Sequence, residues 1–146
     1  MHTLKRNALL PYSARQMFEL VNTIEDYPRF LPWCSSSQII SRTDEEIVAA
    51  LEIAWKGIHK NFTTRNRIFP YERIEISLVN GPLHRLDGIW GFYPLDEYAC
   101  KITLDLEFEF TGHFIDRLFQ PVFQHIANTL VDAFCQRALE LYGPSK

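Results

Sequence analysis

The chain has 146 residues, of which 47% are hydrophobic and 23% are charged, and its formal net charge is −3. This balance excludes a disordered chain and predicts one folded domain over residues 1–146 with a sizeable core. No run of about 18 apolar residues is present, so the sequence predicts no membrane-spanning helix. The net negative charge argues against binding to DNA and other nucleic acids over a broad surface, but it leaves a local basic patch open.

The first predicted elements are a strand and two short helices. Residues 3–10 alternate between polar and apolar types, and Pro11 ends the strand. Ser13, with Gln16 three residues later, predicts a helix N-cap with a capping box. A second short helical turn follows around residues 24–27. The stretch 27–34 carries two prolines and three aromatic residues, which predicts a rigid apolar connection.

From residue 36 to residue 111 the pattern has a period of two, which predicts about six antiparallel strands. The segments 47–56, 61–68 and 102–111 each have one apolar face. Turn signals separate the segments, and the strongest is Asn80-Gly81-Pro82. Short turns between consecutive strands favour a meander.

The segment from Phe114 to Tyr142 predicts a long amphipathic helix. Two rows at spacing four, starting at Leu118 and Phe119, are apolar, and the row starting at Gln120 is polar. Gly143 and Pro144 end the helix. Pro121 either begins the regular helix or kinks it, and a kink would let residues 114–119 move as a gate. A helix of roughly 30–43 Å needs a surface of matching length.

The order of these elements predicts an α+β protein with the helix-grip (START or Bet v 1-like) fold. A curved antiparallel sheet of six to seven strands would wrap around the long C-terminal helix, with the two short helices after the first strand. Thr64 and Asn66 share the apolar face of their strand, and Gly88 leaves space beside Trp90, so the helix is interpreted as the lid of a cavity. The predicted cavity residues are Trp55, Phe62, Thr64, Asn66, Trp90, Phe92, Phe108, Phe110, Phe119, Phe123, Ile126 and Leu130. The predicted rim consists of Phe30, Leu31, Pro32 and Trp33. The alternative is an ordinary apolar core at most of these positions.

Residues of metal or catalytic chemistry do not cluster in the sequence. The five histidines are scattered and the three cysteines are far apart, so no metal site is predicted and the cysteines are interpreted as free thiols. The alternating acids from Asp105 to Glu109 fit a solvated strand face better than a general acid–base pair. No catalytic residue is assigned.

Four basic residues are candidates for contact with RNA phosphates. They are Lys56, Lys60, Arg65 and Arg67. The alternative is a solvated face in which nearby glutamates pair with these cations, and that alternative is favoured because the chain as a whole is negative.

Several separated motifs resemble one known family. The stretch 21–34 (VNTIEDYPRFLPWC) is similar to a signature shared by the bacterial ribosome association toxins (RatA) and the mitochondrial coenzyme Q-binding proteins, both START-like. The segments 62–66, 77–83, 88–92 and 106–110 resemble the strands of the same family in the same order. The likeness covers essentially the whole chain. The short length and the lack of a presequence are similar to the bacterial branch.

The resemblance implies a non-enzymatic protein that binds ubiquinone or a similar polyprenyl lipid in an internal cavity and requires no cofactor. For the toxin branch it also implies association with the large ribosomal subunit, which blocks subunit joining. It implies a cytoplasmic protein, with transient contact at the inner membrane left open. The alternative is an enzyme related to the polyketide cyclases and dehydrases, acting on an aromatic or polyketide substrate in the same cavity. Thr64, Asn66 and Arg6 are the polar candidates for such an enzyme.

Overall fold

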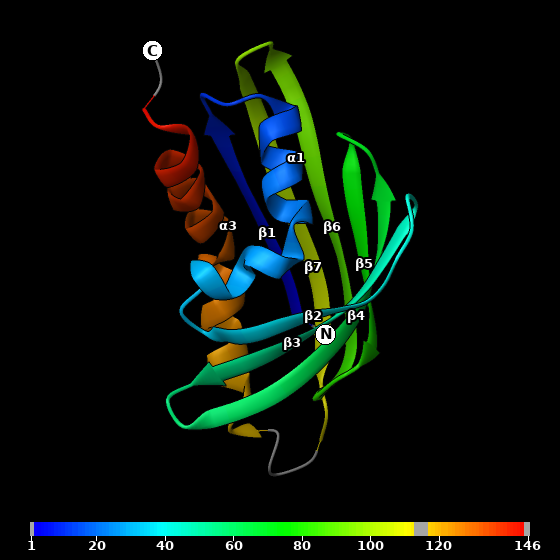
Figure 1. Ribbon diagram of the computed structural model, residues 1–146. Coiled ribbons are helices and arrows are strands. Elements are labelled where there is room, and N and C mark those ends of the chain that lie inside the picture. The colour runs from blue at the N-terminus through cyan, green and yellow to red at the C-terminus, as the bar shows by residue number, and fades with distance from the viewer. Residues whose placement is uncertain (1, 113–116, 145–146) are drawn as a thin grey trace.

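The computed structural model describes residues 2–112 and 117–144, and its elements follow the predicted order (Figure 1). The elements are β1 (His2–Leu10), α1 (Ala14–Asn22), the 3₁₀ helix η1 (Ile24–Arg29), β2 (Cys34–Arg42), β3 (Glu46–Trp55), β4 (Ile58–Phe69), β5 (Arg73–Asn80), β6 (Leu83–Asp96), β7 (Ala99–Phe110) and α3 (Gln120–Tyr142). The helix-grip prediction is confirmed: the described residues form one seven-stranded antiparallel sheet, two short helices after β1 and a long C-terminal helix.

The sheet is a meander from β2 to β7, and β1 adds an edge strand beside β7. The strand order is β1-β7-β6-β5-β4-β3-β2, so the first strand pairs with the last. In that pairing Lys5 lies opposite Asp105 and Leu4 lies opposite Leu106. The acids of β7 therefore lie on the solvated face beside a lysine, as predicted.

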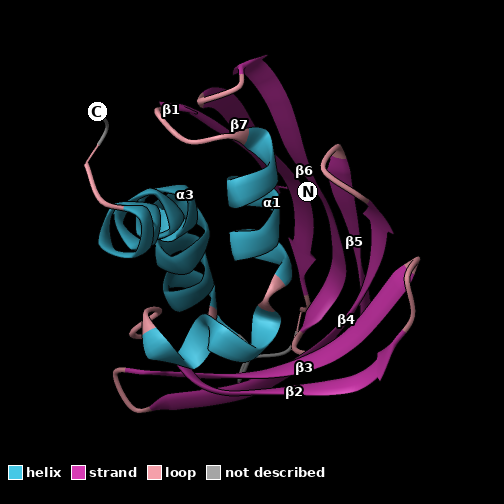
Figure 2. Ribbon diagram, turned by 45° about the horizontal axis from the view of Figure 1, so that its top comes forward, coloured by secondary structure: helices cyan, strands magenta, loops and turns pink. Residues whose placement is uncertain are grey.

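The sheet curves around the helices and gives them its apolar face. Figure 2 shows α1, η1 and α3 inside the concave side of the sheet. Along β7 the inward residues Ile102, Leu104 and Leu106 are buried, whereas Asp105 and Glu107 between and beside them are exposed. Burial of a large aliphatic or aromatic side chain stabilises the folded state by about 1.5–3 kcal/mol, so these alternating positions determine which face of the sheet turns inward.

The predicted capping box is confirmed at the start of α1. The Ser13 hydroxyl accepts a hydrogen bond from the backbone N–H of Gln16, and the Gln16 side chain accepts one from the backbone N–H of Ser13. Beside this cap the Tyr12 hydroxyl donates a 2.6 Å hydrogen bond to the carbonyl of Gly143. The C-terminal end of α3 is therefore fixed against the start of α1.

The start of α3 clarifies the role of Pro121. The proline lies in the first turn of the helix, where its missing N–H breaks no hydrogen bond, so of the two predicted alternatives the proline begins the helix. Residues 114–116 of the predicted helix lie outside the described residues.

Both ends of the predicted apolar stripe are exposed: Leu118, which precedes α3, is 61% exposed, and Leu139 in the last turn of α3 is 45% exposed. Four residues turn a helix by about 400°, so a row at spacing four drifts by about 40° per step and leaves the buried face near the C-terminal end of α3.

Candidate ligand-binding cavity

A cavity of about 130 Å³ lies between the concave side of the sheet, η1 and α3. Its lining comes from α1, η1, the η1–β2 connection, β3 to β7 and α3, and it is almost entirely apolar. The lining residues are Val21, Ile24, Tyr27, Trp33, Ala49, Leu51, Ile53, Phe62, Thr64, Asn66, Ile74, Ile76, Leu86, Trp90, Leu106, Phe123, Ile126, Ala127, Leu130 and Phe134.

Two polar side chains from β4 interrupt this apolar surface. The hydroxyl of Thr64 donates a 3.2 Å hydrogen bond to the amide oxygen of Asn66, and Asn66 is only 9% exposed. Because this bond engages the amide oxygen, the two N–H donors of the Asn66 amide are not used by it. The pair therefore offers directed hydrogen-bond donors to a carbonyl or ether oxygen in an otherwise apolar space.

Tyr27 of η1 adds a third polar group to the lining. Its hydroxyl donates a hydrogen bond to the backbone carbonyl of Val21, at the end of α1. Burial is the main cause that raises the pKa of Tyr27, and the nearby Cys34 and Glu25 raise it further. The neutral phenol is therefore held in place as a structural donor, and its ring forms part of the cavity wall.

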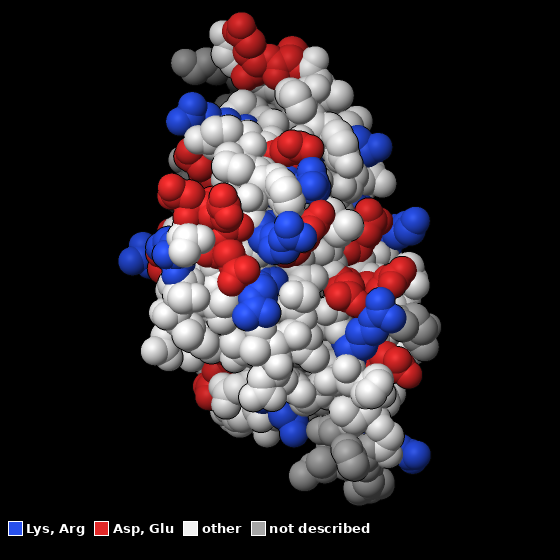
Figure 3. Space-filling view, turned by 90° about the vertical axis from the view of Figure 1, so that its right-hand side faces the viewer, with Lys and Arg blue, Asp and Glu red and all other residues white. Residues whose placement is uncertain are grey.

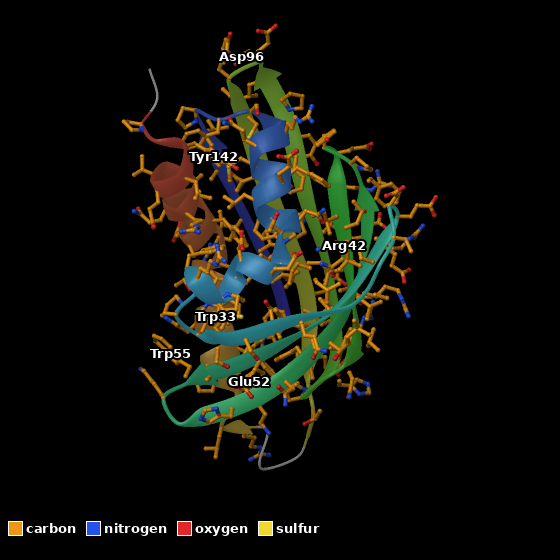
Figure 4. All side chains as sticks on the ribbon, viewed as in Figure 1. Trp33, Arg42, Glu52, Trp55, Asp96 and Tyr142 are labelled. Atoms are coloured by element: carbon orange, nitrogen blue, oxygen red, sulfur yellow. The ribbon has the colours of Figure 1, made fainter. Side chains whose placement is uncertain are left out.

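The residues predicted to form the cavity rim, Phe30 to Trp33, are mostly buried rather than exposed at an opening. Trp33 lines the cavity and Leu31 is 1% exposed. The ring of Phe30 lies 5.3 Å from that of Phe134 and is covered by the guanidinium of Arg137 at 5.2 Å. Pro32 is exposed. The connection therefore closes the cavity between η1 and β2, and Figure 4 shows Trp33 beside η1, near the start of β2.

The structure brings together the predicted cavity residues from the middle of the sheet and the helix. These are Phe62, Thr64, Asn66, Trp90, Phe123, Ile126 and Leu130. Five other predicted residues lie outside the cavity walls, because the apolar face of each strand continues past the cavity. They are Trp55, Phe92, Phe108, Phe110 and Phe119.

These five residues pack against other aromatic rings. Phe92 packs against Phe18 of α1, with ring centroids 5.5 Å apart. Phe108, Phe110 and Phe119 surround Phe123 at 4.9 to 6.0 Å. This aromatic cluster fills the interior between the cavity and the start of α3. Trp55 stacks on His125 at the end of β3.

Gly88 does not leave the space that its sequence position predicts. A Cβ atom at Gly88 would lie 2.6 Å from the side chain of Leu106 on the neighbouring strand. Leu106 therefore already occupies the volume beside Gly88, and Gly88 does not line the cavity, whereas Leu106 and Trp90 do.

The volume limits what this conformation can hold. A cavity of about 150 Å³ accommodates one benzene molecule, and sites for larger ligands are usually about 300–1,000 Å³. A cavity of about 130 Å³ therefore accommodates one ring or a short branched chain. A complete polyprenyl lipid requires displacement of the covering elements η1 or α3.

The four predicted RNA contacts do not form one patch. Arg65 and Arg67 lie on the convex face of the sheet, where they pair with Glu46 at 3.2 Å and Glu75 at 3.5 Å. Figure 3 shows the basic and acidic side chains intermingled on that face. Lys56 and Lys60 belong to the β3–β4 hairpin, and Lys60 follows the same strand face as Phe62. Exposed ion pairs contribute about 0–1 kcal/mol each, and the pairing agrees with the solvated-face interpretation for the two arginines.

The other polar candidates lie away from the cavity. Arg6 donates a 2.8 Å hydrogen bond to Asn128 on the exposed side of α3. Cys34 and Cys100 are buried, and burial raises the pKa of each thiol to about 11. Among the described residues, His, Cys, Asp and Glu side chains form no group of three that could hold a metal ion.

Most of the lining residues that the prediction omitted lie on strands and are Ala49, Leu51, Ile53, Ile74, Ile76, Leu86 and Leu106, whereas the short helices add Val21, Ile24 and Tyr27. Ile24 and Tyr27 lie in a six-residue 3₁₀ helix, which is too short for a periodic pattern to show its buried face. Phe134 could have been found, because it continues the row from Ile126 and Leu130 at spacing four.

A curved antiparallel sheet that encloses an apolar cavity under a long C-terminal helix defines the START-like class of proteins. The solved structure of the Zhui aromatase/cyclase from Streptomyces sp. R1128 has this fold, with a TM-score of 0.82 and 15% identity over 97% of this chain and 98% of that one. Such a low identity shows a shared fold and no more.

The chain belongs to the family described as polyketide cyclase/dehydrase and lipid transport, whose model matches residues 10–135. It is 49% identical to the ribosome association toxin RatA of Pseudomonas aeruginosa, over 96% of this chain and 97% of that protein. It is also 27% identical to a mitochondrial coenzyme Q-binding protein of Xenopus laevis, over 92% of this chain and 57% of that protein. The predicted relationship to RatA and the coenzyme Q-binding proteins is confirmed. Family and cavity together support a START-like protein that binds a hydrophobic ligand.

Proposed function

We propose that the chain binds a ubiquinone-like lipid without chemical turnover, with the ring of the ligand in the cavity. The observation that carries the proposal is the Thr64–Asn66 pair, which lies buried among apolar side chains. A quinone carbonyl is an acceptor and suits the amide donors of Asn66, whereas the rest of the ring suits the surrounding Phe, Ile and Trp side chains. The relative named as a coenzyme Q-binding protein supports the same ligand class.

A carrier needs no acid or base at the ligand, and the cavity fits this requirement. Among the described lining residues none bears a carboxylate, an imidazole, an amine or a thiol. The Tyr27 hydroxyl is held by Val21, and burial raises its pKa, which makes it a poor proton acceptor. A cyclase or dehydrase would have to act with Thr64 and Asn66 alone.

The direct test is extraction of the purified protein with organic solvent, followed by mass spectrometry. A quinone in the extract supports the proposal, and a stoichiometric extract of another lipid class contradicts it. Binding is then measured by quenching of tryptophan fluorescence with a short-chain quinone, since Trp33 and Trp90 line the cavity.

The double variant Thr64→Val/Asn66→Leu tests whether the polar pair binds the quinone. Replacing both partners by apolar side chains of similar shape leaves stability nearly unchanged. Loss of one buried hydrogen bond should weaken quinone binding roughly tenfold. Thr63→Val is the matched control, because Thr63 lies on the opposite face of β4 beside Arg65. Equal affinities of the double variant and the control would refute the assignment of the polar pair.

A second function, association with the large ribosomal subunit, is proposed from the relatives. The supporting observation is the 49% identity, over almost the full length of both chains, to a protein named as a ribosome association toxin. Sedimentation of the chain with large subunits at low salt tests it. Arg65→Glu/Arg67→Glu should abolish co-sedimentation if the convex face makes the contact, whereas Lys56→Glu should do so if the hairpin does. If the protein stays at the top of the gradient and does not sediment with the large subunits, this function is excluded.

A further inference from the structure

Exposed apolar side chains lie at both opposite ends of the molecule, and the two ends differ in charge. One end, the basic end, consists of the β3–β4 hairpin (residues 55–60), the β5–β6 turn (residues 79–84) and residues 117–118. The other, the acidic end, is the tip of the β6–β7 hairpin (residues 95–98). Figure 4 shows Trp55 at the first end and Asp96 at the second.

Residues that adjoin the three segments of the basic end contact one another. Thr63, just after the β3–β4 hairpin, pairs with Asn80 of the β5–β6 turn. In that turn a Cβ atom on Gly81 would lie 3.1 Å from the ring of Phe62. The ring of Phe62 lies 5.5 Å from that of Phe119, which follows Leu118. These contacts place the three segments at the same end of the molecule.

The basic end combines protruding apolar groups with cations. Leu118 is 61% exposed and Val79 is 47% exposed. Lys56 and Arg117, both exposed, supply positive charge, with the exposed histidines His59 and His84 beside them. Two carboxylates lie close to this end: Glu52 accepts a hydrogen bond from the Ser35 hydroxyl, and Glu109 lies opposite Arg85, which itself pairs with Asp87.

The acidic end has exposed apolar groups of similar size but the opposite charge. Leu95 is 59% exposed and Tyr98 is 76% exposed, and between them lie Asp96 and Glu97. An apolar group inserts into an anionic lipid surface only where its neighbours do not repel that surface. The charge therefore favours the basic end as the part of the molecule that contacts an anionic lipid surface.

The cavity is also nearer to the basic end. On β4 the lining residue Phe62 is two residues from Lys60, which is roughly 7 Å along a strand. On β6 the lining residue Trp90 is five residues from Leu95, or roughly 17 Å. A ligand that leaves a bilayer at the basic end has the shorter path to the polar pair.

The structure assigns the basic end as a docking surface for an anionic phospholipid bilayer. Leu118 and Val79 enter the acyl boundary, and Lys56 and Arg117 face the phosphate groups. Among the described residues no helix is long and apolar enough to cross a membrane, so contact of this kind is peripheral. The role of the surface in ligand exchange rests on the proposed function, but the binding itself does not.

The test is co-sedimentation of the full chain with vesicles that contain no quinone. Vesicles of phosphatidylcholine alone are compared with vesicles of phosphatidylcholine and phosphatidylglycerol at low salt. Binding should require phosphatidylglycerol.

Lys56→Asn should lower the partition coefficient roughly fivefold, since one cation near the surface is lost. Asparagine is suitable because residue 56 has a φ of 51°, which asparagine tolerates. Leu118→Asp should lower it about tenfold.

Leu95→Asp at the acidic end is the matched control and should leave vesicle binding unchanged. Equal loss in Leu95→Asp and Leu118→Asp, or equal binding to both kinds of vesicle, overturns the assignment. Retention on structured RNA with no binding to anionic vesicles also overturns it, in favour of a nucleic-acid surface. A chain that docks on the vesicles but yields no quinone on extraction supports the docking surface and refutes the proposed ligand.

Discussion

Trp55 at the end of β3 and His125 in the second turn of α3 stack almost parallel, with ring centroids 5.8 Å apart and 18° between the ring planes. The two residues join the tip of the β3–β4 hairpin to the helix that covers the cavity. Ile53 and Ile126, which line the cavity, are close neighbours of the stacked pair in sequence. The stack therefore connects the two sides that would separate if the cavity opened beside the hairpin.

We predict a favourable coupling between these two rings. Aromatic pairs contribute about 0.5–1.5 kcal/mol beyond the area that they bury. A double-mutant cycle with Trp55→Leu and His125→Ala, followed by urea unfolding, should therefore give a coupling energy in that range. In the quinone-binding assay the single variants should also release ligand faster. A coupling energy of zero would show that the contact does not hold the two elements together.

Truncation of Phe134 should be among the most destabilising changes in α3. Phe134 is 1% exposed, and its ring lies 5.3 to 5.4 Å from those of Trp90, Phe30 and Tyr27. Phe134→Ala should lower the free energy of unfolding by about 3–5 kcal/mol, measured by urea denaturation, because it removes packed volume at the cavity wall. Leu139→Ala on the same helix, at a position 45% exposed, should have little effect and serves as the control.

The ion pair between Glu25 and Arg42 should make stability depend on pH in the acid range. Arg42 donates two hydrogen bonds of 2.8 Å to the Glu25 carboxylate, and these bonds lower the pKa of Glu25 below its ordinary value. A lowered carboxyl pKa stabilises the folded state above the unfolded-state pKa, and this stabilisation is lost as the pH falls through the folded-state pKa.

Both side chains of this pair are nearly half exposed, so the effect at neutral pH should be below about 1 kcal/mol. The difference in unfolding free energy between the wild type and Glu25→Gln should therefore be small and positive at pH 7. It should decline below about pH 4.3, the ordinary pKa of glutamate. A difference that grows on acidification would show that the ion pair does not stabilise the folded state.

The cysteines should react slowly while the protein is folded. Burial raises the pKa of Cys34 and Cys100 to about 11, so about one thiol in a thousand is ionised at pH 8. Burial also raises the pKa of Cys135, which is only partly buried. With a disulfide reagent at pH 8, Cys135 should be modified first, and Cys34 and Cys100 only after urea is added. Rapid modification of Cys34 in the native state would show that the η1–β2 connection opens.

The sequence was sufficient to predict the architecture because each level of the pattern agrees with the next. Period-two alternation gave the strands, and the spacing-four rows gave the long helix. The polar residues Thr64 and Asn66 were found by the same reasoning, since their position in the alternation places them on the apolar face. Strand parity thus predicts which face a side chain occupies.

The alternation of side chains along a strand does not show how far along that strand the cavity extends. Phe92 and Phe108 have the predicted inward orientation but lie past the ends of the cavity, because packing in three dimensions decides where the sheet and α3 separate. Nor could parity show that Leu106 fills the space at Gly88, since this depends on the cross-strand register. Tyr27 was missed as a lining residue because a short 3₁₀ helix shows no periodicity.

The separation of charge between the two ends makes the molecule an electric dipole. With a net charge of −3, the chain as a whole is repelled by an anionic surface at long range, whereas its basic end is attracted at short range. The repulsion is screened first, because the Debye length is about 10 Å at 0.1 M salt. Affinity for an anionic surface should therefore pass through a maximum at intermediate ionic strength. A molecule that approaches such a surface should turn its basic end toward it before contact.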